Sequence, residues 1–451
     1  MMGSERQYIE LFQQNRALLA QSPQVIDRLR DTSYENFCRM GFPTTKAERY
    51  RYTNVAESFS PDYGVNLKRV AFPLNPYEIF RCDVPNLSTS LYFVVNDQFY
   101  ERELPKASLP EGVIVGSLAR AAAERPDLIS KYYGRQAQSG EDAITALNSM
   151  LVQDGLFVYV PKNVVLERPL QIVNVLRADV DLMANRRVLV VLEEGASSQL
   201  LVCDHAMDER SFLVTQVVEA FVGENAHLEF YELEETHALC RRFSNMFVRQ
   251  EANSTGTFDN ISLSCGLTRN LADIVLDGEN AEVHVNGCVV ADGNQHVDNN
   301  TLIDHRSPAC SSNELYKYVL DGNAVGAFAG RILVRKGAQK TVSQETNANL
   351  CATRTARMFT QPMLEIYADD VKCSHGSTVG QLNDAALFYM RQRGIPESEA
   401  RLLLKFAFVG EVIDSIRLAP LRDRLHYLTE KRFRGELGKC AGCRTNQNCG
   451  L

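Results

Sequence analysis

The chain has 451 residues, enough for a large core and for two or three domains, or for one elongated all-β body. Acidic residues outnumber basic ones by 56 to 48, and the resulting net charge of −8 argues against nucleic acid and anionic membranes as partners. No run approaches the roughly 20 apolar residues of a membrane span, and the first residues lack the apolar region of a signal peptide, so a cytoplasmic location is expected.

Residues 1–150 are expected to form a mixed, mainly helical domain. Ser4-x-x-Gln7 is a capping-box pattern, and the apolar residues that follow recur at roughly 3.6-residue spacing: Tyr8, Leu11, Phe12, Leu18 and Leu19. A second helical stretch covers about residues 113–151, and LYFVVNDQFY between the two is typical of a strand.

Residues 151–380 are expected to form an all-β core. From Leu156 onward, short alternating or fully apolar runs follow one another with no room for crossover helices. Turn-plus-strand units begin at Glu193, Val222, Asp277 and Asp321, each with a turn Gly or Asn, then Ala, then a strand. Their uneven spacing favours a β-helix with irregular coils, and the scarcity of two-residue hairpin turns argues against a sandwich.

Residues 381–436 return to a helical pattern. The run Ile395-Pro396-Glu397-Ser398 is typical of a helix start, and the helix that follows is apolar around more than one face, including Phe408, Val412 and Ile413. Two interpretations are open: these residues form the core of a C-terminal helical domain, or part of the apolar surface docks a partner protein.

The stretch VKCSHGSTVG, residues 371–380, places Cys373 and His375 two positions apart. On a strand the two side chains project from the same face, with Ser374 opposite, and they would supply half of a metal or sulfur site. The other ligands would have to come from another coil or from a second subunit. On the residues alone Cys373 is more often an inert core thiol, because spacing alone does not make a cysteine reactive.

Several catalytic motifs are missing from the sequence. The absence of a phosphate-binding loop, G-x-G-x-x-G, H-E-x-x-H and G-x-S-x-G disfavours nucleotide hydrolases, dinucleotide-dependent oxidoreductases, zincin proteases and α/β-hydrolases. Most of the twelve cysteines are expected to be reduced, buried thiols. The tail, residues 437–451, carries Cys440, Cys443 and Cys449, which is one ligand short of a closed zinc site, so incidental thiols are expected, with accessory metal or persulfide chemistry as the alternative.

Three segments resemble the SufB/SufD family of the SUF iron–sulfur cluster assembly machinery. The longest is EIYADDVKCSHGSTVGQLNDAALFYMRQRGIPESEARLLLKFAFVGEVID, residues 365–414, which is similar to the C-terminal signature of the family. The segments PTTKAERYRYTNV, residues 43–55, and ALNSMLVQDGLFVYVPKNVVLERPLQIVNV, residues 146–175, resemble the family's N-terminal element and the start of its β-helix. The C-S-H-G run at residues 373–376 and the chain length favour the SufD branch.

This resemblance implies a right-handed parallel β-helix core flanked by N-terminal and C-terminal helical regions, in a scaffold subunit that is not an enzyme. It implies a SufB-like partner joined through the β-helix, and a SufC-like ABC-type ATPase docked on the C-terminal helices near Phe408, Val412 and Ile413. It also implies that His375 helps to hold a nascent iron–sulfur cluster at the interface with the SufB-like subunit. Cys373 has a less secure role, and no cluster is expected to bind stably to the isolated chain.

Two other functions remain as alternatives. One is a SufB-like primary cluster scaffold that acts as a homodimer. The other is a β-helix enzyme acting on acidic polysaccharide, with Asp369, Asp370 and Lys372 as its candidate residues. Self-pairing of the isolated chain and flavin binding by the assembled complex are left open by the sequence.

Overall fold

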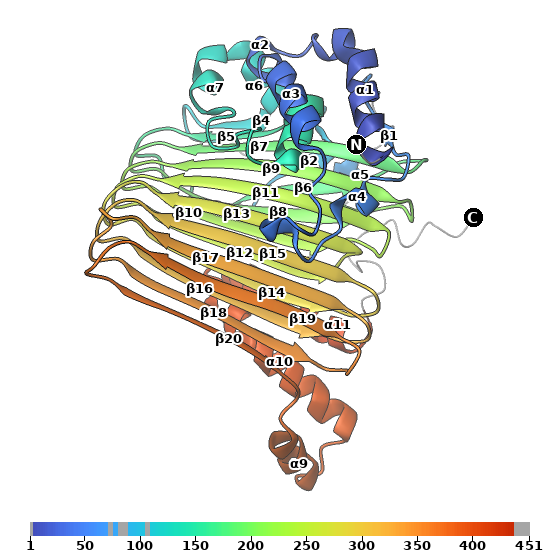
Figure 1. Ribbon diagram of the computed structural model, residues 1–451, viewed down its shortest axis with the longest axis vertical. Helices are drawn as coiled ribbons and strands as arrows, with labels where there is room; N and C mark the ends of the chain where they lie inside the picture. Colours follow the sequence, from blue (N-terminus) through green and yellow to red (C-terminus); the bar gives the residue numbers. More distant parts are fainter. Residues whose placement is uncertain (1–2, 71–74, 80–88, 104–108, 437–451) are drawn as a thin grey trace.

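The computed structural model describes residues 3–70, 75–79, 89–103 and 109–436. It is mainly β, with 41% strand and 26% helix, and its core is a parallel β-solenoid of about 8 turns with helices at both ends of the chain, as Figure 1 shows. The fold class expected from the sequence is therefore confirmed.

Two parallel sheets face each other and form the solenoid. Sheet A contains β1 (Gly64–Val65), β4 (Ile114–Ser117), β5 (Gly155–Val160), β7 (Leu182–Leu192), β9 (Phe212–Val222), β11 (Cys240–Gln250), β13 (Leu267–Leu276), β15 (His296–His305), β17 (Val325–Val334) and β19 (Arg357–Ile366). Sheet B contains β2 (Ser90–Val95), β3 (Gln98–Phe99), β6 (Leu170–Leu176), β8 (Ser197–Ala206), β10 (His227–Glu235), β12 (Thr255–Ser264), β14 (Glu282–Ala291), β16 (Ser311–Leu320), β18 (Val342–Cys351) and β20 (Lys372–Gly380).

The coils have nearly equal lengths. One register position of sheet B is occupied in turn by Ser197, His227, Thr255, Glu282, Ser311, Val342 and Lys372, so each coil takes 27 to 31 residues. The uneven spacing seen in the sequence has a structural cause, because the units at Glu193, Val222 and Asp277 lie at corners leading into sheet B, whereas the unit at Asp321 lies at a corner leading into sheet A.

The corners leading into sheet B share a backbone conformation and a hydrogen-bond pattern. A residue with positive φ stands at each of them except the corner before β20, and these residues are Asn163, Gly195, Asn225, Asn253, Asn280, Ala309 and Lys340. The amide of each of them donates a hydrogen bond to a carbonyl of the next coil, for example from Asn225 to Ala252 at 2.9 Å. Asn is the non-glycine residue that best tolerates this conformation, which explains its recurrence.

Helices cover the two outer faces of the solenoid. The N-terminal helices over sheet A are α1 (Gly3–Leu19), α2 (Gln24–Asp27), α3 (Arg30–Met40), η1 (Glu48–Tyr50), α4 (Val55–Ser58), α6 (Leu118–Glu124), α7 (Pro126–Tyr132) and α8 (Ala143–Leu151). The short helix α5 (Pro76–Ile79) instead packs through Tyr77 on β2 of sheet B. The expected helix near the N-terminus is confirmed, although Ser4 already lies inside α1 and so does not cap it. Sheet B is covered by the C-terminal helices α10 (Glu397–Ser415) and α11 (Ala419–Phe433), whereas α9 (Asp384–Gln392) projects beyond the last coil. No helix in the described ranges is long and apolar enough to cross a membrane.

Candidate functional site

The stretch VKCSHGSTVG forms β20, the last strand of sheet B. The strand pairs in parallel with β18 on one side only, with Ser343 opposite Cys373 and Glu345 opposite His375. Because side chains alternate along a strand, Cys373 and His375 share the face that looks into the solenoid, and Lys372 and Ser374 point the other way. The structure therefore brings the two sequence-predicted side chains to one face at the end of the solenoid.

Cys373 is half-buried in an apolar environment. It packs against the small cluster formed by Ile332, Val334, Ala338 and Ala368. Burial raises the pKa of the Cys373 thiol above its ordinary value, so the reactive thiolate is disfavoured at neutral pH. These surroundings favour a packing role for Cys373.

His375 is exposed, because no further coil follows β20. Behind it, at the same register position on β18 and β16, lie Glu345 and Glu314. Both carboxyl groups are fully buried. Sequence reasoning missed this row, because Glu314 and Glu345 are 31 positions apart and are brought into line only by the length of one coil.

The two buried acids affect each other. Burial first, and then the neighbouring charge of Glu314, raises the pKa of Glu345 to about 9. Burial also raises the pKa of Glu314 to about 7, although the hydroxyl of Thr301 donates to its Oε1 at 2.6 Å. Within the described residues, no three His, Cys, Asp or Glu side chains already form a metal-binding group.

Asp370, beside this stretch, has structural partners. The run MLEIYADDVKCSH spans the end of β19, a corner and the start of β20. At that corner Asp370 forms an ion pair with Lys340, and its amide donates to the side-chain oxygen of Gln339 at 2.9 Å. Asp370 therefore helps to hold the corner between β19 and β20 in place.

Phe408, Val412 and Ile413 lie on α10, against the solenoid. Val412 and Ile413 are 1% and 0% exposed and pack on the outer face of sheet B. Phe408 is partly buried, with the ammonium of Lys317 4.8 Å from the centre of its ring. The C-terminal helices α9, α10 and α11 expose other large apolar side chains, namely Phe388 and Tyr389 on α9, Leu403 on α10 and Tyr427 on α11.

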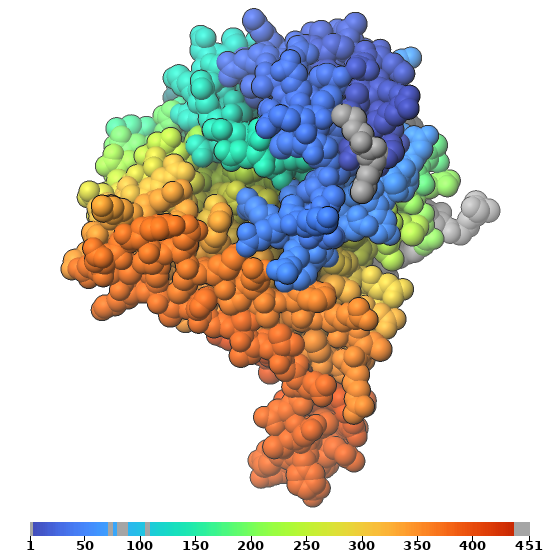
Figure 2. Space-filling view, in the orientation of Figure 1, coloured from blue at the N-terminus to red at the C-terminus, as the bar shows by residue number. Residues whose placement is uncertain are grey.

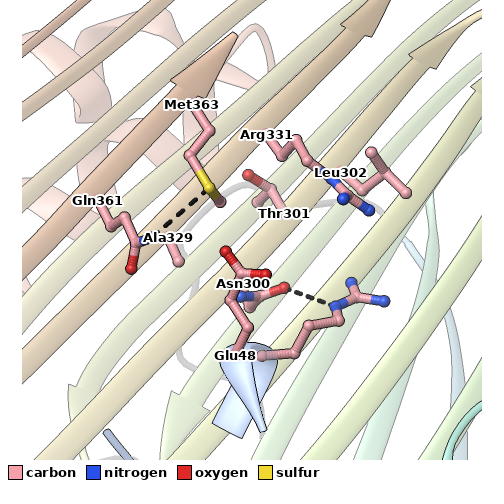
Figure 3. Close-up of a pocket in the computed structure, with 9 residues that line it drawn as sticks. Glu48, Asn300, Thr301, Leu302, Ala329, Arg331, Gln361 and Met363 are labelled. Atoms are coloured by element: carbon pink, nitrogen blue, oxygen red, sulfur yellow. Dashed lines mark hydrogen bonds between the residues drawn. The ribbon is translucent and has the colours of Figure 1, made fainter. Parts of the chain in front are cut away.

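A hollow lies where the N-terminal segment crosses sheet A, and Figure 3 shows its lining. Arg49 at its edge bonds Asn300 at 3.0 Å and forms a bidentate ion pair with Asp273. This arginine ties η1 to β13 and β15, so its charge serves to anchor the N-terminal domain.

The cysteines of the described residues are free thiols: Cys38, Cys203, Cys240, Cys265, Cys288, Cys310, Cys351 and Cys373. The three tail residues considered in the sequence, Cys440, Cys443 and Cys449, lie outside the described ranges.

Comparison with known sequence families gives two adjacent matches. Residues 2–172 match the family described as the SufBD protein N-terminal region, and residues 175–408 match the SUF system FeS cluster assembly, SufBD core domain. An iron–sulfur cluster assembly SufBD family protein of Synechocystis is 28% identical over 89% of this chain and 87% of its own length. The iron–sulfur cluster assembly proteins SufD of Escherichia coli and Bacillus subtilis are 27% and 25% identical, over 87% and 78% of this chain and 89% and 81% of their own lengths.

Proposed function

Because the chain belongs to the SufB/SufD family of SUF iron–sulfur cluster assembly proteins, we propose that it is a scaffold subunit without ATPase or other enzymatic activity. In this proposal it pairs with a SufB-like subunit through the last coil of the solenoid. A SufC-like ATPase docks on its C-terminal helices and supplies the energy that the chain cannot obtain by itself, since it carries no phosphate-binding loop.

The observation that carries the proposal is the unpaired last coil. Both β19 and β20 are edge strands, and the free backbone groups of such strands are a template for pairing with another chain. Exposed apolar side chains accompany them, among them Phe359, Tyr367 and Val379. Pairing with a partner at this end would bury His375 at the interface.

His375 is then placed to help hold a nascent cluster, which is the substrate of the assembly reaction. An imidazole and a thiol on one chain are an incomplete set of ligands for a cluster, which is usually held by thiolates. A SufB-like cysteine across the interface would supply the missing ligand. The isolated chain is accordingly expected to bind no cluster stably, and the free thiols of its described part fit a reducing, cytoplasmic location.

The docking of the ATPase is proposed for the exposed side of the C-terminal helices. Phe388 and Tyr389 are 63% and 59% exposed on α9, which projects from the body in Figure 2. Aromatic side chains exposed together on a projecting helix are typical of protein interfaces. Phe408, Val412 and Ile413 would act behind this surface by fixing α10 to the solenoid.

Co-expression with the cognate SufB-like and SufC-like proteins tests the proposal. The three chains should co-purify, and His375→Ala should reduce cluster formation in the complex by on the order of tenfold or more while the complex stays intact. The matched control is His284→Ala, which removes a half-buried histidine of β14 that pairs with Glu282 at 2.7 Å, far from the last coil. Normal cluster yield from His375→Ala, or no complex with the wild-type chain, would refute the proposal.

A further inference from the structure

Glu314, Glu345 and His375 form a row across the last three strands of sheet B. They occupy the same register position on β16, β18 and β20, so each side chain lies beside the next on the face that looks into the solenoid. The row runs from the interior, where the two acids are fully buried, to the open end, where His375 is exposed.

The oxygens of the two acids are largely without partners. Within the described residues both oxygens of Glu345 and Oε2 of Glu314 accept no hydrogen bond, and only Oε1 of Glu314 is bonded, by Thr301. A buried carboxylate without a partner is strongly unfavourable, and two side by side are more so. The ionised row therefore needs a positive charge to complete it, and without one the acids are neutralised by protons.

Another interior acid of the solenoid shows what a completed site looks like. Glu232 on β10 receives hydrogen bonds from Arg242 at 2.8 Å and from Gln216 at 2.9 Å. The wall facing Glu345 supplies no such group, because Gly330 of β17 stands there and a Cβ at that position would lie 2.5 Å from Oε1 of Glu345. The glycine makes room for the carboxylate and leaves it without a cationic neighbour on that strand.

We propose that Glu314 and Glu345 bind a divalent transition-metal ion inside the last coils of the solenoid, with His375 as the outermost ligand. Two carboxylates balance the charge of such an ion, and carboxylate together with imidazole suits Fe²⁺ and Mn²⁺. The three side chains do not form a metal-binding group in the described residues as they lie here, so His375, which is exposed, would have to turn toward the ion to complete the site. Binding releases to solvent any proton held by the carboxyl groups.

This inference rests on the proposed function only for the identity of the ion. If His375 faces a nascent cluster, a carboxylate site directly behind it would hold Fe²⁺ for that cluster. The ability of the acids to bind a divalent ion is a property of this chain alone, and it is therefore measured on the isolated full-length protein.

The test uses Mn²⁺ in air and Fe²⁺ under anaerobic conditions as probes. Titration calorimetry, together with the electron paramagnetic resonance signal of free Mn²⁺, should show a single tight site on the wild-type chain. Glu345→Gln and Glu314→Gln should each weaken it by more than the roughly 10- to 100-fold that loss of an outer-sphere partner costs a metal site. His375→Ala should weaken it less. Glu282→Gln, which alters a Glu–His pair at 2.7 Å on β14, should leave it unchanged.

Thermal unfolding without metal checks that the variants fold. Glu345→Gln should unfold at the same temperature as the wild type or higher, because a neutral amide replaces an unpaired buried acid. Added Mn²⁺ should raise the unfolding temperature of the wild type and not that of Glu345→Gln.

Equal binding by the wild type and Glu345→Gln, or no binding by the wild type, would overturn the inference and leave the acids as a protonated pair. Either result is compatible with an intact SUF complex. A complex that fails to form, with metal binding retained, would refute the proposed function and not the site.

Discussion

Asp259 and Asp304 are both almost fully buried, yet their surroundings shift their pKa values in opposite directions. Burial raises the pKa of Asp259 to about 7, and the hydrogen bond from Asn286 at 2.8 Å only partly offsets it. Burial acts in the same direction on Asp304, but the hydrogen bonds and charges of Arg335 and Arg306 outweigh it and lower the pKa. The partner of a buried carboxyl group therefore decides how it responds to pH.

The two residues predict opposite effects of an amide substitution. Between about pH 4 and about pH 7 the native state keeps the proton of Asp259 that the unfolded state has lost, so stability falls as the pH rises through this window. Asp259→Asn should remove this loss and raise the free energy of unfolding at about pH 8 by on the order of 1–3 kcal/mol. The difference should vanish near pH 4. Urea unfolding at several pH values measures it.

Asp304→Asn is the matched comparison. The lowered pKa of Asp304 contributes stability above the unfolded value of ~4 that is lost as the pH falls, so this variant should be less stable than the wild type by about 1–3 kcal/mol at neutral pH. The difference in free energy of unfolding between this variant and the wild type should become smaller as the pH falls toward ~4 and below. A gain in stability for Asp304→Asn, or a loss for Asp259→Asn at about pH 8, would contradict this account.

At the scale of elements, two lysines fix α10 to the solenoid. Lys317 of β16 donates to the carbonyl of Phe408 at 3.0 Å and forms an ion pair with Glu411, and Lys405 of α10 reaches Asp321 at 2.6 Å. The Lys317 side chain is only 10% exposed, so its bonds are poorly screened by solvent. This attachment holds the helices that the proposal assigns to ATPase docking.

Lys317→Met should loosen α10 without unfolding the solenoid. The apolar stem is kept, but the bond to Phe408 and the ion pair are lost, which should lower the free energy of local opening by about 1–3 kcal/mol. Amide hydrogen exchange should become faster in α10 and stay unchanged in the strands of sheet A. Lys336→Met makes the same change at an exposed corner and should have no effect. Uniform acceleration throughout the chain would argue against a local anchor.

The elements themselves were largely predictable from the sequence. The start of α10 directly after Pro396 and the Asn or Gly corners before β6, β8, β10, β12 and β14 depend on local backbone preferences, which the sequence carries directly. The Glu314–Glu345–His375 row was not predictable, because it depends on the register between coils of slightly different length. The docked face of α10 was ambiguous for a similar reason, since periodicity shows that Val412 and Ile413 are apolar but not what covers them.

At the scale of the whole molecule, the two ends of the solenoid differ. The first coil is closed by the antiparallel strands β3 and β4 and by an apolar cluster that includes Leu118, Ile129 and Phe157. The last coil ends in β19 and β20, each paired on one side only. Repeat structures need capped ends to stay soluble, so an uncapped end is expected to be covered by another chain.

The two open edges are not equivalent. The amide of Arg357 donates to the carbonyl of Ala324 in the preceding coil. Because the direction of the amides alternates along a strand, those of the even-numbered residues of β19 point toward the free edge. Pro362, which has no N–H, is one of these even-numbered residues. A proline at this place makes the edge of β19 less able to accept a new strand. In β20 the amide of Lys372 points toward the preceding coil, where it donates to the carbonyl of Thr341. The amides of Cys373, His375, Ser377 and Val379 therefore point toward the free edge. A partner strand is therefore expected on β20.

Val379→Pro tests this assignment because it removes an edge amide without breaking a bond to β18. The residue is 50% exposed and lies in the penultimate position of the strand, where proline is tolerated if its missing N–H faces outward. The isolated variant should unfold at nearly the wild-type temperature, whereas its recovery in complex with a SufB-like partner should fall by roughly tenfold or more, because one backbone hydrogen bond is lost and the partner strand is displaced. Val379→Thr keeps the amide and the strand preference and should assemble normally. If Val379→Pro assembled as well as Val379→Thr, β20 would not be the pairing edge, and the partner would have to reach His375 by side-chain contacts alone.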